Sequence, residues 1–169
     1  GVIDPRAIDG WSSPEAVAAI ARAIEAIRVE REITLMHVCG THEHAIARAG
    51  IRSLLPAGVR LIAGPGCPVC VCPARDVDLA IAAARRENTV LATFGDMMRV
   101  PATQGSLERA RAEGADVRVV YSPADAIAIA RERPGASVVL MAVGFETTAA
   151  PIAAALAADP PRNLTIIPS

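Results

Sequence analysis

Six short apolar runs, each separated from the next by an amphipathic segment, constrain this chain more than any other feature. Continuous runs rich in Val, Ile and Leu are typical of strands that are buried on both faces of a sheet. The runs are residues 33–38, 59–63, 89–94, 117–121, 137–143 and 164–167. The segments between them have helical periodicity or helix start signals. The alternation predicts an α/β fold with a parallel sheet flanked by helices and built from repeated βα units.

The order of these runs also suggests how the chain is divided. Residues 1–31 form an amino-terminal segment and a helix, which begins at Ser13 and Pro14 as a capped first turn. Residues 32–115 form a first α/β domain with the cysteine motifs, and residues 116–169 begin a second one. Because the last predicted strand has no covering helix, we expect this second domain to be incomplete and the chain to be the amino-terminal part of a longer protein.

Composition excludes several classes of function. Of the 169 residues, 52% are apolar, which is enough for a hydrophobic core. The 17 basic and 18 acidic residues nearly balance, so charge gives no reason to expect a nucleic-acid partner. We expect no membrane span, because no apolar run approaches the roughly 20 residues that a spanning helix needs. Without a secretory signal at the start, the predicted location is cytoplasmic, where clustered cysteines more often serve metal or redox chemistry.

Three of the four cysteines lie in one stretch, GPGCPVCVCP, which occupies residues 64–73. Cys67 and Cys70 form a C-x-x-C pair, a spacing that is shared by zinc sites and by redox-active dithiols. Cys72 adds a third thiol. A structural zinc site usually has two separated cysteine pairs, whereas a thioredoxin-like module also places C-x-x-C between a strand and a helix. Both alternatives remain open from the residues alone.

The first predicted strand ends at the fourth cysteine, Cys39. A cysteine that precedes a helix favours the thiolate form, which binds metals and attacks disulfides. An isolated cysteine is more often a small buried thiol, but the adjoining His42 and Glu43 and the second cysteine cluster favour a functional role. His42 is the better candidate for a ligand or a proton carrier. We interpret His37 as a residue of the sheet and His44 as part of the following helix.

Two later strand exits also carry polar side chains. Residues 96–99 combine an acid, two methionines and an arginine, and the methionine pair is more typical of packing than of metal binding. Glu146, Thr147 and Thr148 lie at a predicted helix start, where the threonines can cap free amides. Glu146 has no such structural explanation. Since ligands bind at the carboxyl ends of parallel strands, the chemistry should gather on one edge of the sheet.

Five blocks of sequence, each at a strand exit, together resemble the HypD family of hydrogenase maturation factors. They are CGTHE at 39–43, GPGCPVCV at 64–71, FGDMMRVP at 94–101, YSPADA at 121–126 and GFETT at 144–148. The resemblance runs from about residue 9 to the end of the chain. Any one block alone would be a weak signal, but all five occur here in the family's order.

The resemblance implies a scaffold on which the iron of a nickel-iron hydrogenase receives cyanide and carbon monoxide, the Fe(CN)2CO moiety. The family's partners are a small HypC-like chaperone and a HypE-like cyanide donor. By the family pattern Cys39 binds the iron together with a cysteine of HypC, and His42 lies close by. Cys67 and Cys70 form the redox-active pair. The pattern places Glu146 with His42 among the catalytic residues and assigns binding of the moiety to three threonines: Thr41, Thr147 and Thr148.

Some features depart from the family pattern. Family members usually have threonine at the position of Cys72 and glycine at that of Ala102. They also carry four further cysteines for an iron-sulfur cluster in a carboxyl-terminal part, and those ligands are absent from this chain. We therefore expect an assembly scaffold with redox-active thiols more than a turnover enzyme. The alternatives are a thiol-disulfide oxidoreductase and a zinc-stabilised structural domain.

Overall fold

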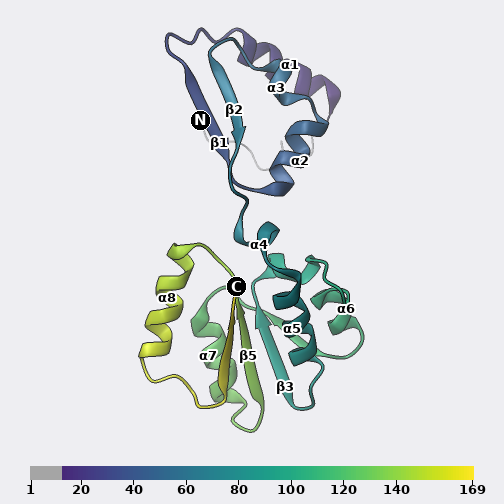
Figure 1. Cartoon of the computed structure of the whole chain (residues 1–169), viewed down its shortest axis with the longest axis vertical. Helices are drawn as coiled ribbons and strands as arrows, with labels where there is room; N and C mark the ends of the chain where they lie inside the picture. Colours follow the sequence, from purple (N-terminus) through teal and green to yellow (C-terminus); the bar gives the residue numbers. More distant parts are fainter. Residues whose placement is uncertain (1–12) are drawn as a thin grey trace. The chain divides into compact units, whose positions relative to one another are not determined.

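The computed structural model describes residues 13–169. Residues 1–12 of the predicted amino-terminal segment lie outside the described residues. The chain divides into two compact units, Gly1–Gly66 and Cys67–Ser169, and each is described by itself (Figure 1).

From residue 13 onward, the first unit contains one pair of parallel strands and three helices. In the strand pair Ile33 lies opposite Val59 and His37 lies opposite Ala63, so both strands end at the same edge. The first helix begins as predicted, because the Ser13 hydroxyl accepts a hydrogen bond from the Ala16 amide at 3.1 Å. The elements are α1 (Pro14–Glu25), β1 (Ile33–His37), α2 (Gly40–Arg48), α3 (Ile51–Leu54) and β2 (Val59–Ala63).

The second unit contains a four-stranded parallel sheet with the order β4-β3-β5-β6. Its strands are β3 (Thr89–Thr93), β4 (Asp116–Val119), β5 (Ser137–Ala142) and β6 (Leu164–Pro168). Its helical segments are α4 (Pro68–Val71), α5 (Ala74–Ala84), the 3₁₀ turn η2 (Gly95–Arg99), α6 (Leu107–Ala112), α7 (Pro123–Glu132) and α8 (Glu146–Ala157).

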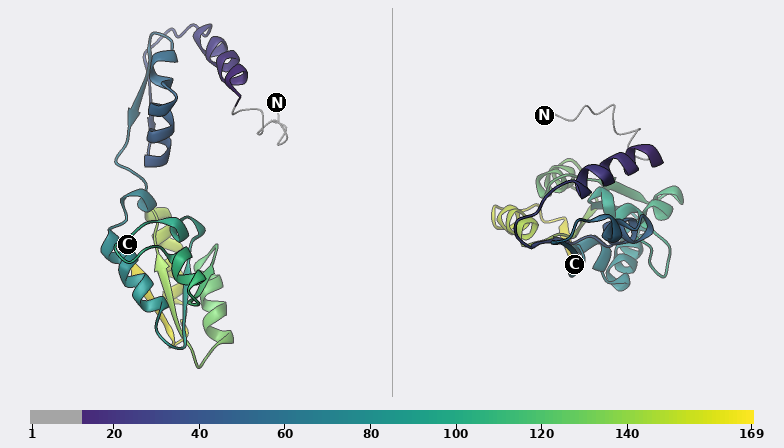
Figure 2. Two further views of the ribbon diagram at one scale, coloured as in Figure 1. Left: turned by 90° about the vertical axis from the view of Figure 1, so that its right-hand side faces the viewer. Right: turned by 90° about the horizontal axis from the view of Figure 1, so that it is seen from above.

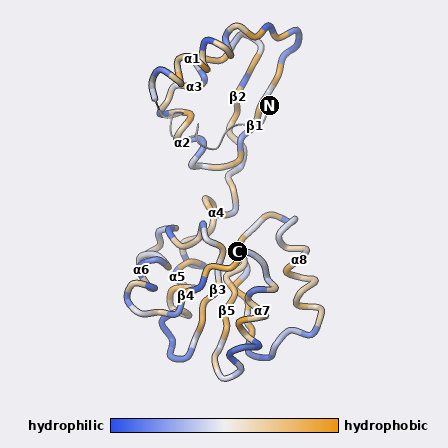
Figure 3. Tube along the Cα trace, turned by 180° about the vertical axis from the view of Figure 1, so that it is seen from behind, coloured by the Kyte–Doolittle hydropathy of each residue, from blue (hydrophilic) through white to orange (hydrophobic). Residues whose placement is uncertain are grey.

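The core of the second unit lies on both faces of this sheet. Alternate side chains of a strand point to opposite faces. Leu91 of β3 therefore joins the cluster that contains Ile81 of α5 and Leu107 of α6, whereas its neighbour Ala92 joins the cluster with Ile152 of α8. The helices lie around the strands in Figure 2, and β3 and β5 are coloured as apolar segments in Figure 3. Coverage on both faces explains the continuous apolar runs of β3 and β5. The same expectation is wrong for β1 and β2 of the first unit, where Leu35 and Met36 are 51% and 59% exposed.

The α/β class with parallel strands and flanking helices is confirmed, but the six strands form two sheets of two and four strands. The sequence-based domain boundary near residues 115 and 116 falls inside the second unit. Val90 of β3 pairs there with Asp116 of β4, so the two strands share one sheet. Compact units divide instead after Gly66. The reason is that β3 pairs with β4 and β5, while β2 pairs with β1.

Three short helical segments were not expected from the sequence: α3, α4 and η2. Each has four or five residues, which is too short to show a helical period. Elsewhere the expected strand and helix bounds differ from the observed ones by a few residues at either end. Among the described residues, no helix combines the length and the apolar composition needed to cross a membrane.

The start of α7 gives a prediction about pH. Asp125 accepts hydrogen bonds from the Tyr121 and Ser122 amides at 2.9 Å each, and the bond from Tyr121 is the main cause that lowers the pKa of Asp125 below its ordinary 3.8. A carboxyl group whose pKa is lowered by folding stabilises the folded state above its unfolded pKa, and loses this effect as the pH falls. We expect Asp125→Asn to lower the melting temperature at pH 7, and the difference from the parent chain to shrink below pH 4.

Thermal unfolding followed by circular dichroism at several pH values measures this difference. Asp159→Asn is the control, because Asp159 is exposed and has a left-handed backbone that asparagine tolerates. A loss for Asp125→Asn that does not change between pH 7 and pH 3 would contradict the prediction.

Candidate metal-binding and thiol site

Cys39 occupies the turn between β1 and α2. Its backbone is extended, with φ −99° and ψ 130°, and it is the amino-terminal cap residue of α2. The chain thus leaves the strand without bending and enters the helix one residue later. The Cys39 carbonyl accepts a hydrogen bond from the Glu43 amide at 3.0 Å, which closes the first turn. The side chain of Cys39 is partly buried at the carboxyl end of the strand.

The exit of β2 lies directly against the exit of β1. The Gly64 amide donates a hydrogen bond to the His37 carbonyl at 2.7 Å, which continues the strand pairing by one residue. A Cβ atom at position 64 would lie 2.8 Å from that carbonyl oxygen, closer than side-chain carbons approach backbone. Glycine is therefore required for this contact. Cys67 follows Gly64 by only three residues.

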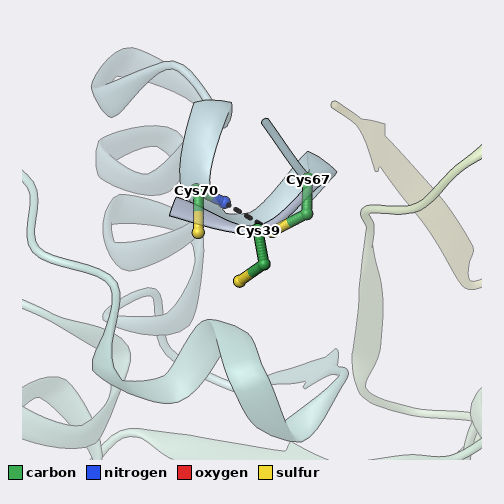
Figure 4. Close-up of side chains that lie close together, drawn as sticks. All are labelled: Cys39, Cys67 and Cys70. Atoms are coloured by element: carbon green, nitrogen blue, oxygen red, sulfur yellow. Dashed lines mark hydrogen bonds between the residues drawn. The ribbon is translucent and has the colours of Figure 1, made fainter. Parts of the chain in front are cut away.

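Cys67 and Cys70 are brought together by α4. Cys67 is the cap residue of this short helix, and Pro68 occupies the first helical position, where its missing amide is no loss. The Cys67 sulfur accepts a hydrogen bond from the Cys70 amide at 3.4 Å (Figure 4). A donor aimed at sulfur favours the thiolate form. Cys67 is partly buried and Cys70 is exposed.

The thiols that carry the candidate chemistry lie in both units, and each set is described by itself. In the first unit Cys39 lies between the end of β1 and the start of α2. In the second unit Cys67 and Cys70 lie within one turn of each other at α4. Thiolate ligands suit soft or borderline metals such as zinc and iron, so these cysteines fit metal binding. The Cys72 sulfur is 3.1 Å from the Ser169 hydroxyl oxygen.

The remaining sequence-predicted residues lie elsewhere on the strand exits. His42 and Thr41 are exposed in the first turn of α2, and Glu146 and Thr147 are exposed in the first turn of α8. Thr148 is partly buried, and its amide donates to the Phe145 carbonyl at 2.8 Å. The roles predicted for these residues stay predictions.

A polar array beside Cys39 was not expected from the sequence. Nε2 of His37 lies 2.6 Å from Oε2 of Glu43. Arg52 donates to both carboxylate oxygens of Glu43, at 2.9 and 2.7 Å. The hydrogen bonds from Arg52 are the main cause that lowers the pKa of Glu43, and the bond to His37 acts in the same direction. Arg52 comes from a different helix, so no local motif could have indicated this contact.

An α/β fold with cysteine thiols at its strand exits defines a protein suited to metal or redox chemistry at sulfur. A sequence profile with the description "Hydrogenase formation hypA family", that of HypD, matches residues 15–169. The chain belongs to the HypD family.

Individual members of this family are close in sequence. The chain is 50% identical to hydrogenase maturation factor HypD2 of Bradyrhizobium diazoefficiens over 147 aligned residues. The alignment covers 86% of this chain and 39% of that protein. It is 51% identical over 146 residues to HypD of Azotobacter vinelandii, with 86% and 38% covered. It is 45% identical over 149 residues to HypD of Escherichia coli, with 85% and 40% covered. The chain thus spans about two fifths of the length of these curated relatives.

Proposed function

We propose that this protein acts in nickel-iron hydrogenase maturation, as a scaffold that holds iron while the Fe(CN)2CO moiety is assembled. The observation that carries the proposal is the position of Cys39 between the end of β1 and the start of α2, in a chain that belongs to the HypD family. The relatives are named hydrogenase maturation factors, in agreement with this role. Iron is here the cargo that is modified and handed on. A cytoplasmic location belongs to the same proposal, because a reducing compartment keeps such cysteines available for metal and exchange chemistry.

Within this proposal the three cysteines have different tasks. Cys39 serves as the protein's iron ligand, because it follows a strand and begins a helix, where its thiolate is favoured. Cys67 and Cys70 serve as the redox pair. Closure of a dithiol to a disulfide releases two electrons and two protons, so the pair can act as a two-electron donor to the iron site. A HypC-like chaperone supplies a further thiolate, and a HypE-like protein supplies cyanide.

Other sequence-predicted residues belong to the same proposal. His42 lies in the first turn of α2, next to the turn of Cys39, and is proposed as a ligand or proton carrier. Glu146 lies in the first turn of α8 at the carboxyl edge of the four-stranded sheet, where ligands of this fold class bind. Three hydroxyl groups at these two helix starts are proposed to contact the moiety: Thr41, Thr147 and Thr148.

One observation favours a second candidate function. The Cys70 amide donates to the Cys67 sulfur, and Cys70 is exposed. A stabilised sulfur beside an accessible partner at a helix start is the arrangement of thiol-disulfide oxidoreductases. In that case Cys67 and Cys70 would exchange disulfides with other proteins, and Cys39 would be dispensable. A zinc-stabilised structural domain is the remaining alternative.

The test is anaerobic co-purification with a HypC-like partner, followed by metal analysis and infrared spectroscopy. We expect bound iron and absorption in the cyanide and carbonyl region, and expect both to be lost in Cys39→Ala. Cys72→Ala is the matched control, because Cys72 has no role in the proposal and its sulfur contacts the Ser169 hydroxyl group, and it should keep both signals.

The two alternatives predict different results. Bound zinc without partner affinity would refute the scaffold and support the structural domain. Insulin reduction that survives Cys39→Ala and is lost in Cys67→Ala, with no iron bound, would support the oxidoreductase.

A further inference from the structure

Arg52 is the centre of a polar array that joins three elements of the first unit. Its Nη1 and Nη2 atoms donate to the two oxygens of Glu43 in the first turn of α2. Its Nε atom donates to the Leu61 carbonyl of β2 at 3.3 Å. Glu43 in turn lies 2.6 Å from Nε2 of His37, the last residue of β1. The Arg52 side chain from α3 thus contacts β2 directly, and it contacts α2 and β1 through the carboxylate of Glu43.

The second ring nitrogen of His37 shows how far the orientation of the ring depends on Glu43. The Nδ1 atom of His37 is buried and makes no hydrogen bond to any described residue. Glu43 therefore provides the hydrogen bond that orients this ring. The carboxylate of Glu43 is itself oriented by two parallel hydrogen bonds from one guanidinium group, a geometry with high directional specificity.

The array surrounds the turn that carries Cys39. Cys39 comes two residues after His37, and its carbonyl accepts the Glu43 amide at 3.0 Å. The His37 carbonyl also accepts the Gly64 amide, which fixes the neighbouring strand exit. Both residues that define the Cys39 turn, His37 before it and Glu43 after it, are thus held by side chains of one array.

We propose that Arg52 is a positioning residue for Cys39, which acts through Glu43 and His37 by holding the β1–α2 turn in the geometry needed for metal binding. The inference rests on the proposed function in that it takes Cys39 as a metal ligand. Stability alone explains the array poorly, because the side chains of Arg52 and Glu43 are 40% and 37% exposed and ion pairs at such surfaces contribute little. Hydrogen-bond partners that orient ligand residues commonly change metal affinity 10- to 100-fold.

The experiment measures cobalt(II) binding to the full chain under anaerobic conditions, by the sulfur-to-cobalt charge-transfer band. We expect Arg52→Gln to raise the dissociation constant about tenfold. Arg52→Lys should raise it less, because lysine keeps the charge but cannot form the paired hydrogen bonds. Arg48→Gln, an exposed arginine in the last turn of α2 and outside the array, is the matched control and should have no effect.

A second background separates positioning from a general loss of structure. In Cys39→Ser the thiols of Cys67 and Cys70 remain, so weaker cobalt binding can still be measured. If Arg52 acts through Cys39, Arg52→Gln should change the affinity less than about twofold in this background, since coupled residues are non-additive. An equal loss in both backgrounds, or no loss in either, would overturn the inference.

Hydrogen exchange provides a readout that does not depend on metal. Arg52→Gln should speed exchange of the Glu43 amide, which donates to Cys39, by at least about tenfold, while amides of α5 keep their protection. If the parent chain binds no cobalt, the proposed metal function fails, and the array is then judged on this exchange alone. Unchanged protection of the Glu43 amide would overturn it.

Discussion

Replacement of Asn163 by aspartate is expected to destabilise the second unit by about 3 kcal/mol or more. The Nδ2 group of Asn163 lies within 3.0 Å of three backbone carbonyls that end α7 and lead into β5, those of Ala130, Arg133 and Ala136. An aspartate would place a negative charge against three carbonyl oxygens and remove the donor. The three carbonyl groups of the α7–β5 connection would then lose the side chain that donates hydrogen bonds to them.

Chemical denaturation of the full chain, followed by circular dichroism, measures the loss. Asn163→Ala separates the two causes, because it removes the donor without adding a charge, and we expect it to cost about 1–3 kcal/mol. Asn163→Asp should also recover part of its loss at low pH, where the carboxyl group is neutral and can donate a proton to one carbonyl. Equal stability of the aspartate and alanine variants at pH 7 would contradict the electrostatic part of this prediction.

Replacement of Gly144 by alanine is expected to cost about 1–3 kcal/mol through steric overlap. A Cβ atom at position 144 would lie 2.4 Å from Cβ, 2.5 Å from Oγ1 and 2.6 Å from Cγ2 of Thr148. No side chain can occupy that space unless the strand exit of β5 or the first turn of α8 moves. The overlap involves Cβ of Thr148, so rotation of its side chain cannot remove it.

Two further variants make the prediction specific. Gly135→Ala is the matched control, because nothing lies within 4 Å of a Cβ atom at position 135, and it should change stability by less than about 0.5 kcal/mol. In a Thr148→Gly background Gly144→Ala should become nearly neutral, since its clashing partner is gone. A Gly144→Ala loss that is unchanged in this background would refute the steric explanation.

Much of the fold follows from the sequence, and the failures have a common cause. The apolar runs around Leu91 and Leu140 predict strands because these side chains are buried between helix layers. The runs do not encode which strands pair. The apolar pattern of a strand is the same whether or not the next strand along the chain pairs with it in one sheet. For this reason the division after Gly66 could not be found from periodicity.

The candidate site shows the same division between local and distant information. Cys39, Cys67 and Cys70 were expected at strand exits, and the motifs that identify them are contiguous in sequence. The array of Glu43 and Arg52 was not expected, because their contact joins two helices across nine residues. Side-chain pairing of this kind depends on how helices pack, and single-sequence patterns contain little information on it.

The surroundings of Cys72 allow this cysteine to be replaced, which would simplify spectroscopy of the other three. Cys72 packs against the hydrophobic core of the second unit, and its sulfur lies 3.1 Å from the Ser169 hydroxyl oxygen. A threonine at this position would keep a hydroxyl group and a methyl group there. A Cys72→Thr chain would contain no cysteine besides Cys39, Cys67 and Cys70, so that every thiolate feature in a sulfur-edge absorption spectrum could be assigned to those three residues.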